Sequence, residues 1–356
     1  MTRLSPSGRQ PSRFWLFAPF VLAALGAAAW TGLWFTVKTQ AVAALDAWVG
    51  EARAAGREAG YTAVKAAGYP LRFELVVDGL RVADPGAGFW WSARSLSLHL
   101  LPYQPHHVIV QSRGPQTLRV RRGGAVWTIE ATSLKASLRW TGQDLRRFSL
   151  HADDLVWRDV ANRRGDISAF ELHVAPTPGR TDLWRLWMTA DGGVAPQVPP
   201  ALAVFGREFS QVKVTGAVTR PDLLKTGLSP ARLADWSSGG GALTIDRADG
   251  SWGRVRWSAV GQFTADADGA PQGRLRVTLH NLRAVADILT EAGWVGGPVA
   301  ALTRAAADEA EQKQGGLSGD LVLRQGQILV AGAPLAAFSA LGRAPAPPAA
   351  TAGRAP

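Results

Sequence analysis

Leu71-Arg72-Phe73-Glu74-Leu75-Val76-Val77-Asp78 is the stretch of sequence that decides the fold of most of this chain. Apolar side chains occupy every second position, and three of the four positions between them are charged. This period of two predicts a strand with one buried face and one wetter face. The alternation recurs in residues 96–100, 134–140 and, less cleanly, 167–173. Short strands separated by Gly, Pro, Asn and Asp turns are therefore predicted to fill most of residues 71–220.

Beyond that region the strand pattern continues, with helices inserted. Residues 221–236 have a helical composition that includes the N-cap pair Ser229-Pro230. Residues 239–282 indicate successive hairpins, whose turns are predicted at Asp-Gly or Gly. Residues 283–314 return to a helical pattern with a break at Gly296-Gly297-Pro298.

A last hairpin and a tail complete the C-terminal part. The hairpin is predicted over residues 319–332, and the Ala- and Pro-rich residues 343–356 are predicted to be disordered. The four aspartates of the Asp-Gly segments, Asp246, Asp249, Asp266 and Asp268, faintly resemble calcium loops. They lack the final glutamate and flanking helices of an EF-hand, so hairpin turns are the interpretation adopted.

On the N-terminal side, residues 14–37 contain no charged side chain. At the α-helical rise they span about 36 Å, enough to cross a bilayer. Residues 1–13 carry three arginines and no acid, which predicts a cytoplasmic N-terminus with the bulk of the chain in the periplasm. Cleavage of a signal peptide at the small residues Ala27–Ala29 is the alternative to this single-pass inner-membrane anchor.

Residues 38–67 are rich in Ala with charges interspersed, and their apolar positions recur at helical spacing. We therefore expect a membrane-proximal helix over 38–67, ended by Gly68 and Pro70.

The fold class predicted from these patterns is mainly β (α+β). A single transmembrane helix precedes an extended, curled antiparallel sheet with a few packed helices, which fills residues 68–342 with possible halves at 68–220 and 221–342. Helices from the second half are expected inside the curl. The concave face of such a sheet suits an apolar ligand.

Composition limits the function. The chain has no cysteine, which excludes disulfides and thiol-ligated metals. Its net charge of +11 comes mostly from scattered arginines, not from a basic run, and an exported location argues against nucleic acid. The scattered arginines can be explained as residues on solvated strand faces without a function. The functional alternative is that they attract the protein to anionic lipid head groups.

No pattern of catalytic, cofactor-binding or metal-binding residues is found in the sequence. Neighbouring strand residues point to opposite faces, which separates His106 from His107 and Asp153 from Asp154. The run Gly239–Gly241 lacks the ending of a phosphate-binding loop. These observations predict a protein that is not an enzyme and needs no cofactor.

The 15 tryptophans are the least ordinary feature. Trp91, Trp140, Trp157 and Trp257 lie in predicted strands, three of them beside or near arginine. They are candidates to line a groove or an interface, with arginine near lipid head groups. Ordinary packing in the core is the alternative.

Three blocks carry a family resemblance: Gly68–Leu75, Pro102–Val108 and Gly319–Ala336. Together with the N-terminal span they resemble an uncharacterised bacterial family of membrane-anchored periplasmic proteins, over roughly residues 10–342. This resemblance implies location and architecture, and it supplies no catalytic residues. The hairpins over residues 239–282 are also similar to those of the AsmA-type envelope proteins, which are associated with outer-membrane assembly and lipid traffic.

Three hypotheses follow. The first is a non-enzymatic envelope protein whose β-rich domain binds lipid, such as phospholipid, or an envelope partner near the inner membrane. The second is a scaffold that pairs its sheet edges with another envelope protein. The third is a glycan-acting hydrolase that uses two carboxylates.

Overall fold

The computed structural model describes residues 14–337 apart from residues 71, 87, 102–103, 113, 123–124, 143, 196–197, 199, 225–229, 326 and 331–332. The helices are α1 (Phe14–Ala54), α2 (Pro230–Ser238), α3 (Leu282–Glu291) and α4 (Gly297–Gln314), with 3-10 turns η1 (Pro200–Phe205) and η2 (Pro221–Leu224). The strands are β1 (Glu58–Gly60), β2 (Ala63–Ala67), β3 (Phe73–Asp84), β4 (Phe89–Leu101), β5 (Gln104–Ser112), β6 (Gln116–Arg122), β7 (Ala125–Ala131), β8 (Ser133–Thr141), β9 (Asp144–Asp159), β10 (Arg164–Thr177), β11 (Arg180–Val194), β12 (Glu208–Thr219), β13 (Leu243–Trp252), β14 (Val255–Ala265), β15 (Pro271–His280), β16 (Leu317–Arg324), β17 (Gln327–Val330) and β18 (Ala333–Ala337). The tail predicted over residues 343–356 and the segment 1–13, predicted to be cytoplasmic, lie outside the described residues.

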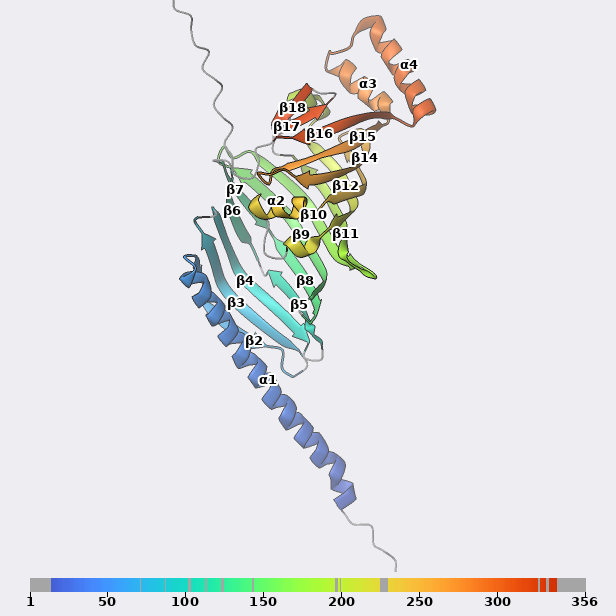
Figure 1. Cartoon of the computed structure of the whole chain (residues 1–356). Coiled ribbons are helices and arrows are strands. Elements are labelled where there is room, and N and C mark those ends of the chain that lie inside the picture. The colour runs from blue at the N-terminus through green and yellow to red at the C-terminus, as the bar shows by residue number, and fades with distance from the viewer. Residues whose placement is uncertain are drawn as a thin grey trace, which may run out of the picture.

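The strands form one antiparallel sheet that largely follows chain order (Figure 1). β1 and β2 share the position beside β3, β5 and β6 share the position beside β4, and β8 and β7 share the position beside β9. From β9 to β18 each strand pairs with the next. The predicted β-rich fold is confirmed. The suggested halves share this sheet, because β12 pairs with β13 across residue 221.

The register of the sheet separates apolar from polar side chains, since directly paired residues share a face. One set of paired residues, which we call the apolar row, crosses the sheet from β3 to β16. Its members are Leu75, Leu98, Val110, Ala136, Leu150, Leu172, Met188, Val214, Ala248, Ala259, Val277 and Gly319.

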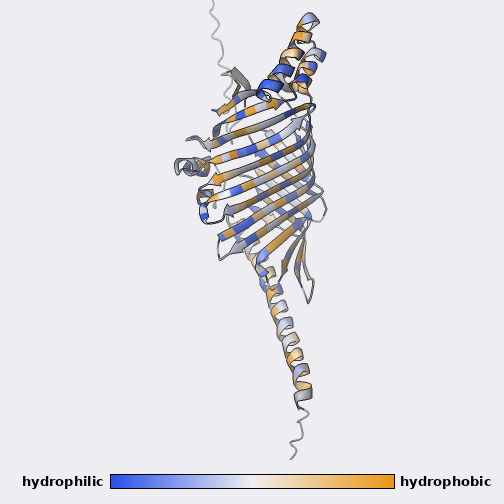
Figure 2. Cartoon of the chain, turned by 90° about the vertical axis from the view of Figure 1, so that its right-hand side faces the viewer, coloured by the Kyte–Doolittle hydropathy of each residue, from blue (hydrophilic) through white to orange (hydrophobic). Residues whose placement is uncertain are grey.

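The adjacent set, which we call the polar row, points to the other face. It consists of Val76, Ser97, Gln111, Lys135, His151, Glu171, Thr189, Lys213, Asp249, Ser258, Thr278 and Ser318. After Val76 every member is polar. The sheet curls into an open trough (Figures 1 and 2). We infer that the apolar face, on which α1 packs, is the inner one.

A seam of irregular residues crosses the middle of the sheet. Asp154 and Gly192 have positive φ, and Ser168 lies between them on β10 and donates to the carbonyl oxygen of Gly192 at 3.0 Å. A bulged residue shifts the inside-outside alternation by one position. Beyond the seam on β9, Trp157 consequently lies on the apolar side.

Helix α1 runs without interruption from the predicted span into the folded body, where it packs on the apolar face of the first strands. Trp34 is buried with Phe73, Leu75 and Val77 in this contact. The prediction that the helix extends to residue 67 is wrong. It ends at Ala54, and residues 58–67 form β1 and β2, because pairing with β3 overrides the Ala-rich composition.

Helices of the second half do not fill the curl as predicted. The break at Gly296-Gly297-Pro298 is confirmed, and α3 and α4 form a hairpin that projects beyond the end of the sheet farthest from the start of α1 (Figure 1). Only α2 lies near the open side of the trough, where Trp236 donates to the carbonyl oxygen of Thr219 at 2.8 Å. The expected turn at Asp249-Gly250 is also wrong, because both residues lie inside β13.

Candidate functional site

The middle of the apolar face is less buried than its two ends. Leu75 is buried under α1, and Ala259 is buried in a cluster on β13 and β14. Between them Leu150, Leu172 and Met188 are only half-buried. In the described part of the chain, the helices contact chiefly β1, β3, β14 and β16, and none packs extensively on β8–β10. A contiguous apolar surface without cover marks an interaction site in a soluble domain.

The dimensions of this face suit an acyl chain. At about 4.8 Å between strands, the apolar row extends over about 50 Å along the curved sheet. An acyl chain of one leaflet reaches about 15 Å and would cross three strands. Because strands of a sheet satisfy their own backbone hydrogen bonds, such a surface offers hydrocarbon chains a wall without unpaired polar groups.

The structure places all four candidate tryptophans on the apolar side. Trp91 and Trp157 belong to one set of paired residues, joined through Leu118 and Ile129. Trp257 packs on the cluster of β13 and β14. The same tryptophan side chains therefore suit both interpretations, because residues on this face can pack in the core or contact an apolar ligand.

The fourth candidate, Trp140, lies at the rim of the trough. It follows Leu138 on the same face of β8, and its ring meets that of His106 edge to face at 6.3 Å. The neighbouring His107 points the other way, and its Nε2 lies 2.9 Å from the Ser137 hydroxyl.

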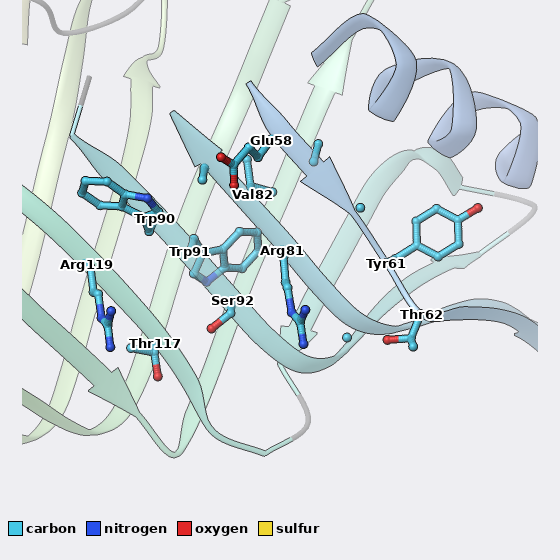
Figure 3. A pocket seen from close by; sticks show the side chains of 14 residues that line it. Glu58, Tyr61, Thr62, Arg81, Val82, Trp90, Trp91, Ser92, Thr117 and Arg119 are labelled. Carbon is cyan, nitrogen blue, oxygen red and sulfur yellow. The ribbon is translucent and has the colours of Figure 1, made fainter. Parts of the chain in front are cut away.

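A separate pocket of about 620 Å³ lies on the polar side of β3, β4 and β6 (Figure 3). Arg81, Ser92 and Thr117 follow one another across these strands, and Arg119 pairs with Trp90 one step further. Both arginines are exposed. Two guanidinium groups beside two hydroxyls are suited to an anionic group such as phosphate. Trp90, Trp91 and Val82 also line this pocket, so apolar as well as polar groups face a ligand there.

A chain of titratable side chains on the polar face escaped the sequence analysis, because its members come from two strands. His151 lies 3.0 Å from Asp153 and 3.2 Å from Glu171, and His173 lies 3.7 Å from Glu171 and 2.8 Å from the Ser149 hydroxyl. The distances resemble those of a hydrolytic triad. These side chains stand on strands whose backbone N–H groups are engaged in the ladder, so those N–H groups do not form an oxyanion hole.

Several acids are held by arginine. Hydrogen bonds from Arg276 lower the pKa of Asp320, and those from Arg304 lower the pKa of Asp287. A general acid needs a carboxyl whose pKa is shifted upward. Asp246 is likewise paired with Arg185 at 2.8 Å. Among the described residues, no group of three or more His, Cys, Asp or Glu side chains is arranged to hold a metal ion.

Comparison with protein families gives one match. The family described as "uncharacterized protein conserved in bacteria (DUF2125)" matches residues 34–339. The chain belongs to this family. The DUF2125 match begins in α1 and extends past β18, so it contains the whole trough. Membership of an uncharacterised bacterial family is thus confirmed, whereas similarity to AsmA-type proteins stays a resemblance. No curated protein and no solved structure matches the chain.

Proposed function

We propose that this DUF2125 protein is anchored in the bacterial inner membrane by α1 and binds lipid acyl chains on the apolar face of its periplasmic sheet, without catalysing a reaction. The observation that carries the proposal is the apolar row. Eleven consecutive paired positions on one face are apolar and the twelfth is Gly319, while eleven of the twelve on the other face are polar. A sheet that only needed a core would bury this face, yet Leu150, Leu172 and Met188 in its middle are only partly buried.

The anchor is supported by the exposure of α1. Among the described residues one helix, over Phe17–Ala54, is long and apolar enough to cross a membrane. Phe20 and Leu22 are 71% and 69% exposed. Side chains of this kind are stable in contact with lipid and costly in water. The arginines before the span support a cytoplasmic N-terminus.

The proposal is tested by measuring the lipid bound to the purified full-length chain. After extraction in a mild detergent and extensive washing, mass spectrometry of an organic extract should find about one phospholipid or more per chain, in the range that a trough of this length accommodates. Met188→Glu, in the apolar row, should lower that amount. Thr215→Glu, on the exposed polar face of β12, should leave it unchanged. Equal lipid in all three proteins would mean that the lipid is only the ring around α1, and would overturn the proposal.

A scaffolding role is the second candidate, because β18 pairs on one side only within the described residues. An edge strand offers unpaired backbone groups to another chain. Cross-linking in cells distinguishes the two functions, since a stoichiometric protein partner in the absence of bound lipid favours the scaffold. Glycan hydrolysis has less support, because acids such as Asp249 are paired with arginine, here Arg247 at 2.6 Å.

A further inference from the structure

Three hydrogen bonds tie the loop between β2 and β3 to a part of α1 that the sequence assigns to the membrane. Trp30 donates through Nε1 to the carbonyl oxygen of Pro70 at 2.7 Å. The hydroxyls of Thr31 and Tyr69 are 2.8 Å apart. Trp34 donates to the carbonyl oxygen of Arg72 at 3.2 Å. The loop therefore lies beside residues 30–34 of the helix.

The helix length fixes the depth of this contact. Phe14 begins α1 directly after the charged residue Arg13. From Phe14 to Trp30 the helix rises about 24 Å, and to Trp34 about 30 Å. The hydrocarbon core is about 30 Å thick, and an average tilt changes these heights by only about 2 Å. The loop is thus level with the outer few ångströms of the hydrocarbon core.

From this arithmetic we propose that the loop residues Gly68–Pro70 and Arg72 are immersed at the outer surface of the inner membrane, so that the trough opens directly onto the outer leaflet and takes phospholipid from it. This inference rests on the proposed function and adds the route by which lipid enters.

The chemistry of the loop suits that position. Backbone groups at membrane depth have to be satisfied within the protein, and the carbonyl oxygens of Pro70, Arg72 and Gly68 all accept hydrogen bonds, the last from the Arg72 N–H at 3.0 Å. Tyr69 is 52% exposed, which is costly in water and favourable at a membrane interface. The Arg72 guanidinium lies 4.0 Å from the Glu74 carboxylate, and its side chain is 66% exposed and long enough to reach lipid phosphate as well.

The trough begins at the same level. Phe73, directly after the loop, pairs with Leu100, which pairs with Val108, which pairs with Leu138. All four are apolar and on the trough side. Trp140, two residues past Leu138 toward the rim, is the kind of side chain that partitions to the interface. An acyl chain that leaves the outer leaflet beside α1 therefore meets apolar side chains without crossing water.

Depth is measured by spin labels, because a chain without cysteine accepts single labels cleanly. Arg72→Cys, labelled and placed in phospholipid nanodiscs, should be on the order of fivefold less accessible to a water-soluble nickel complex than Gln312→Cys, an exposed site on α4. Equal accessibility of the two labels would overturn the immersion of the loop.

The entry of lipid into the trough is tested by moving the loop away from the membrane surface. Seven apolar residues inserted after Leu25 add about two turns, or about 10 Å, and leave the contacts at Trp30–Trp34 intact. Loading from vesicles of phosphatidylethanolamine and phosphatidylglycerol should slow by about tenfold or more, while binding of the same lipids supplied in detergent should be unchanged.

The two claims fail separately in this design. Unchanged loading from vesicles would contradict entry at the membrane and leave lipid binding intact. Absence of binding from detergent in both proteins would contradict the proposed function itself.

Discussion

Placing one negative charge in the middle of the trough should abolish most of its affinity for lipid. Leu172 is half-buried between Leu150 and Met188 on the apolar row. In Leu172→Glu, an acyl chain on this surface loses roughly half of a leucine contact, about 1 kcal/mol. It also has to cover a carboxylate, which costs about 2 kcal/mol or more. The sum of about 3 kcal/mol corresponds to about a 150-fold rise in Kd.

The assay is a titration of the detergent-solubilised chain with a phospholipid that carries a fluorescent group on one acyl chain. Leu172→Met, which keeps the volume and the apolar character, should bind within about threefold of the unchanged protein. Thr215→Glu places the same carboxylate on the exposed polar face and should also bind normally. Circular dichroism of each variant checks that the sheet is retained. Binding by a folded Leu172→Glu within threefold of the unchanged protein, or an equal loss in Thr215→Glu, would refute the reasoning.

Four further outcomes are expected. Trp34→Ala should lower the free energy of unfolding by about 3–5 kcal/mol in denaturant titrations, because its buried ring leaves a cavity in the contact of α1 with the sheet, whereas Trp34→Phe should cost less. Gly193→Ala should lower the free energy of unfolding by about 1–3 kcal/mol, since its new methyl group would lie 2.2 Å from the Phe209 ring. Gly319→Ala, whose methyl group would meet no atom within 4 Å, should be close to neutral in the same titrations. Glu311 accepts the N–H of Leu282 at the start of α3, and this bond lowers the pKa of Glu311. Its stabilisation is present above the pKa of a glutamate in the unfolded chain and is lost as the pH falls through the lower pKa of the folded state. Glu311→Gln should therefore reduce stability by about 0.5 kcal/mol in melts at pH 7 and by nothing at pH 2. Equal losses at both pH values would contradict this. The intact mass of the purified protein should include the N-terminal span, and a mass that begins after Ala29 would show cleavage.

The strands could be predicted because burial on one side imposes a period of two. Leu75 and Val77 had to share a face wherever the sheet packed, and this requirement acts within one strand. The register between strands could not be predicted in the same way. Leu172 meets Met188 only because the turn at Gly179 fixes the pairing of β10 with β11, and the apolar row emerges from many such pairings. Its continuity is therefore invisible in the sequence.

The errors have local causes. Residues 58–67 have a helical composition, but Gly56 adopts φ +76, which ends α1, and the following residues gain more from pairing with β3 than from helix propensity. The glycine was the signal that could have corrected the prediction. Asp249-Gly250 lies in a strand because Gly250 makes room for Trp257, whose ring would lie 2.6 Å from a Cβ at that position. Such an approach depends on the tertiary fold.

The contact between Trp30 and the loop at Pro70 was also beyond the sequence, since 40 residues separate the two partners. The candidate tryptophans were chosen for their strand context, and their common side follows only from the register and from the seam at Asp154. The alternation of apolar and polar residues within each strand thus predicted an apolar face. The pairing between distant strands decided where that face lies.

The most direct measurement is photo-cross-linking with a phospholipid that carries a diazirine near the end of one acyl chain. After irradiation of membranes that contain the full-length protein, peptide mass spectrometry should find adducts on trough residues such as Leu150, Leu172 and Met188, with the polar-row neighbours His151 and Glu171 unlabelled. Adducts confined to residues 14–37 would show that the lipid touches only the membrane helix, and would contradict the account.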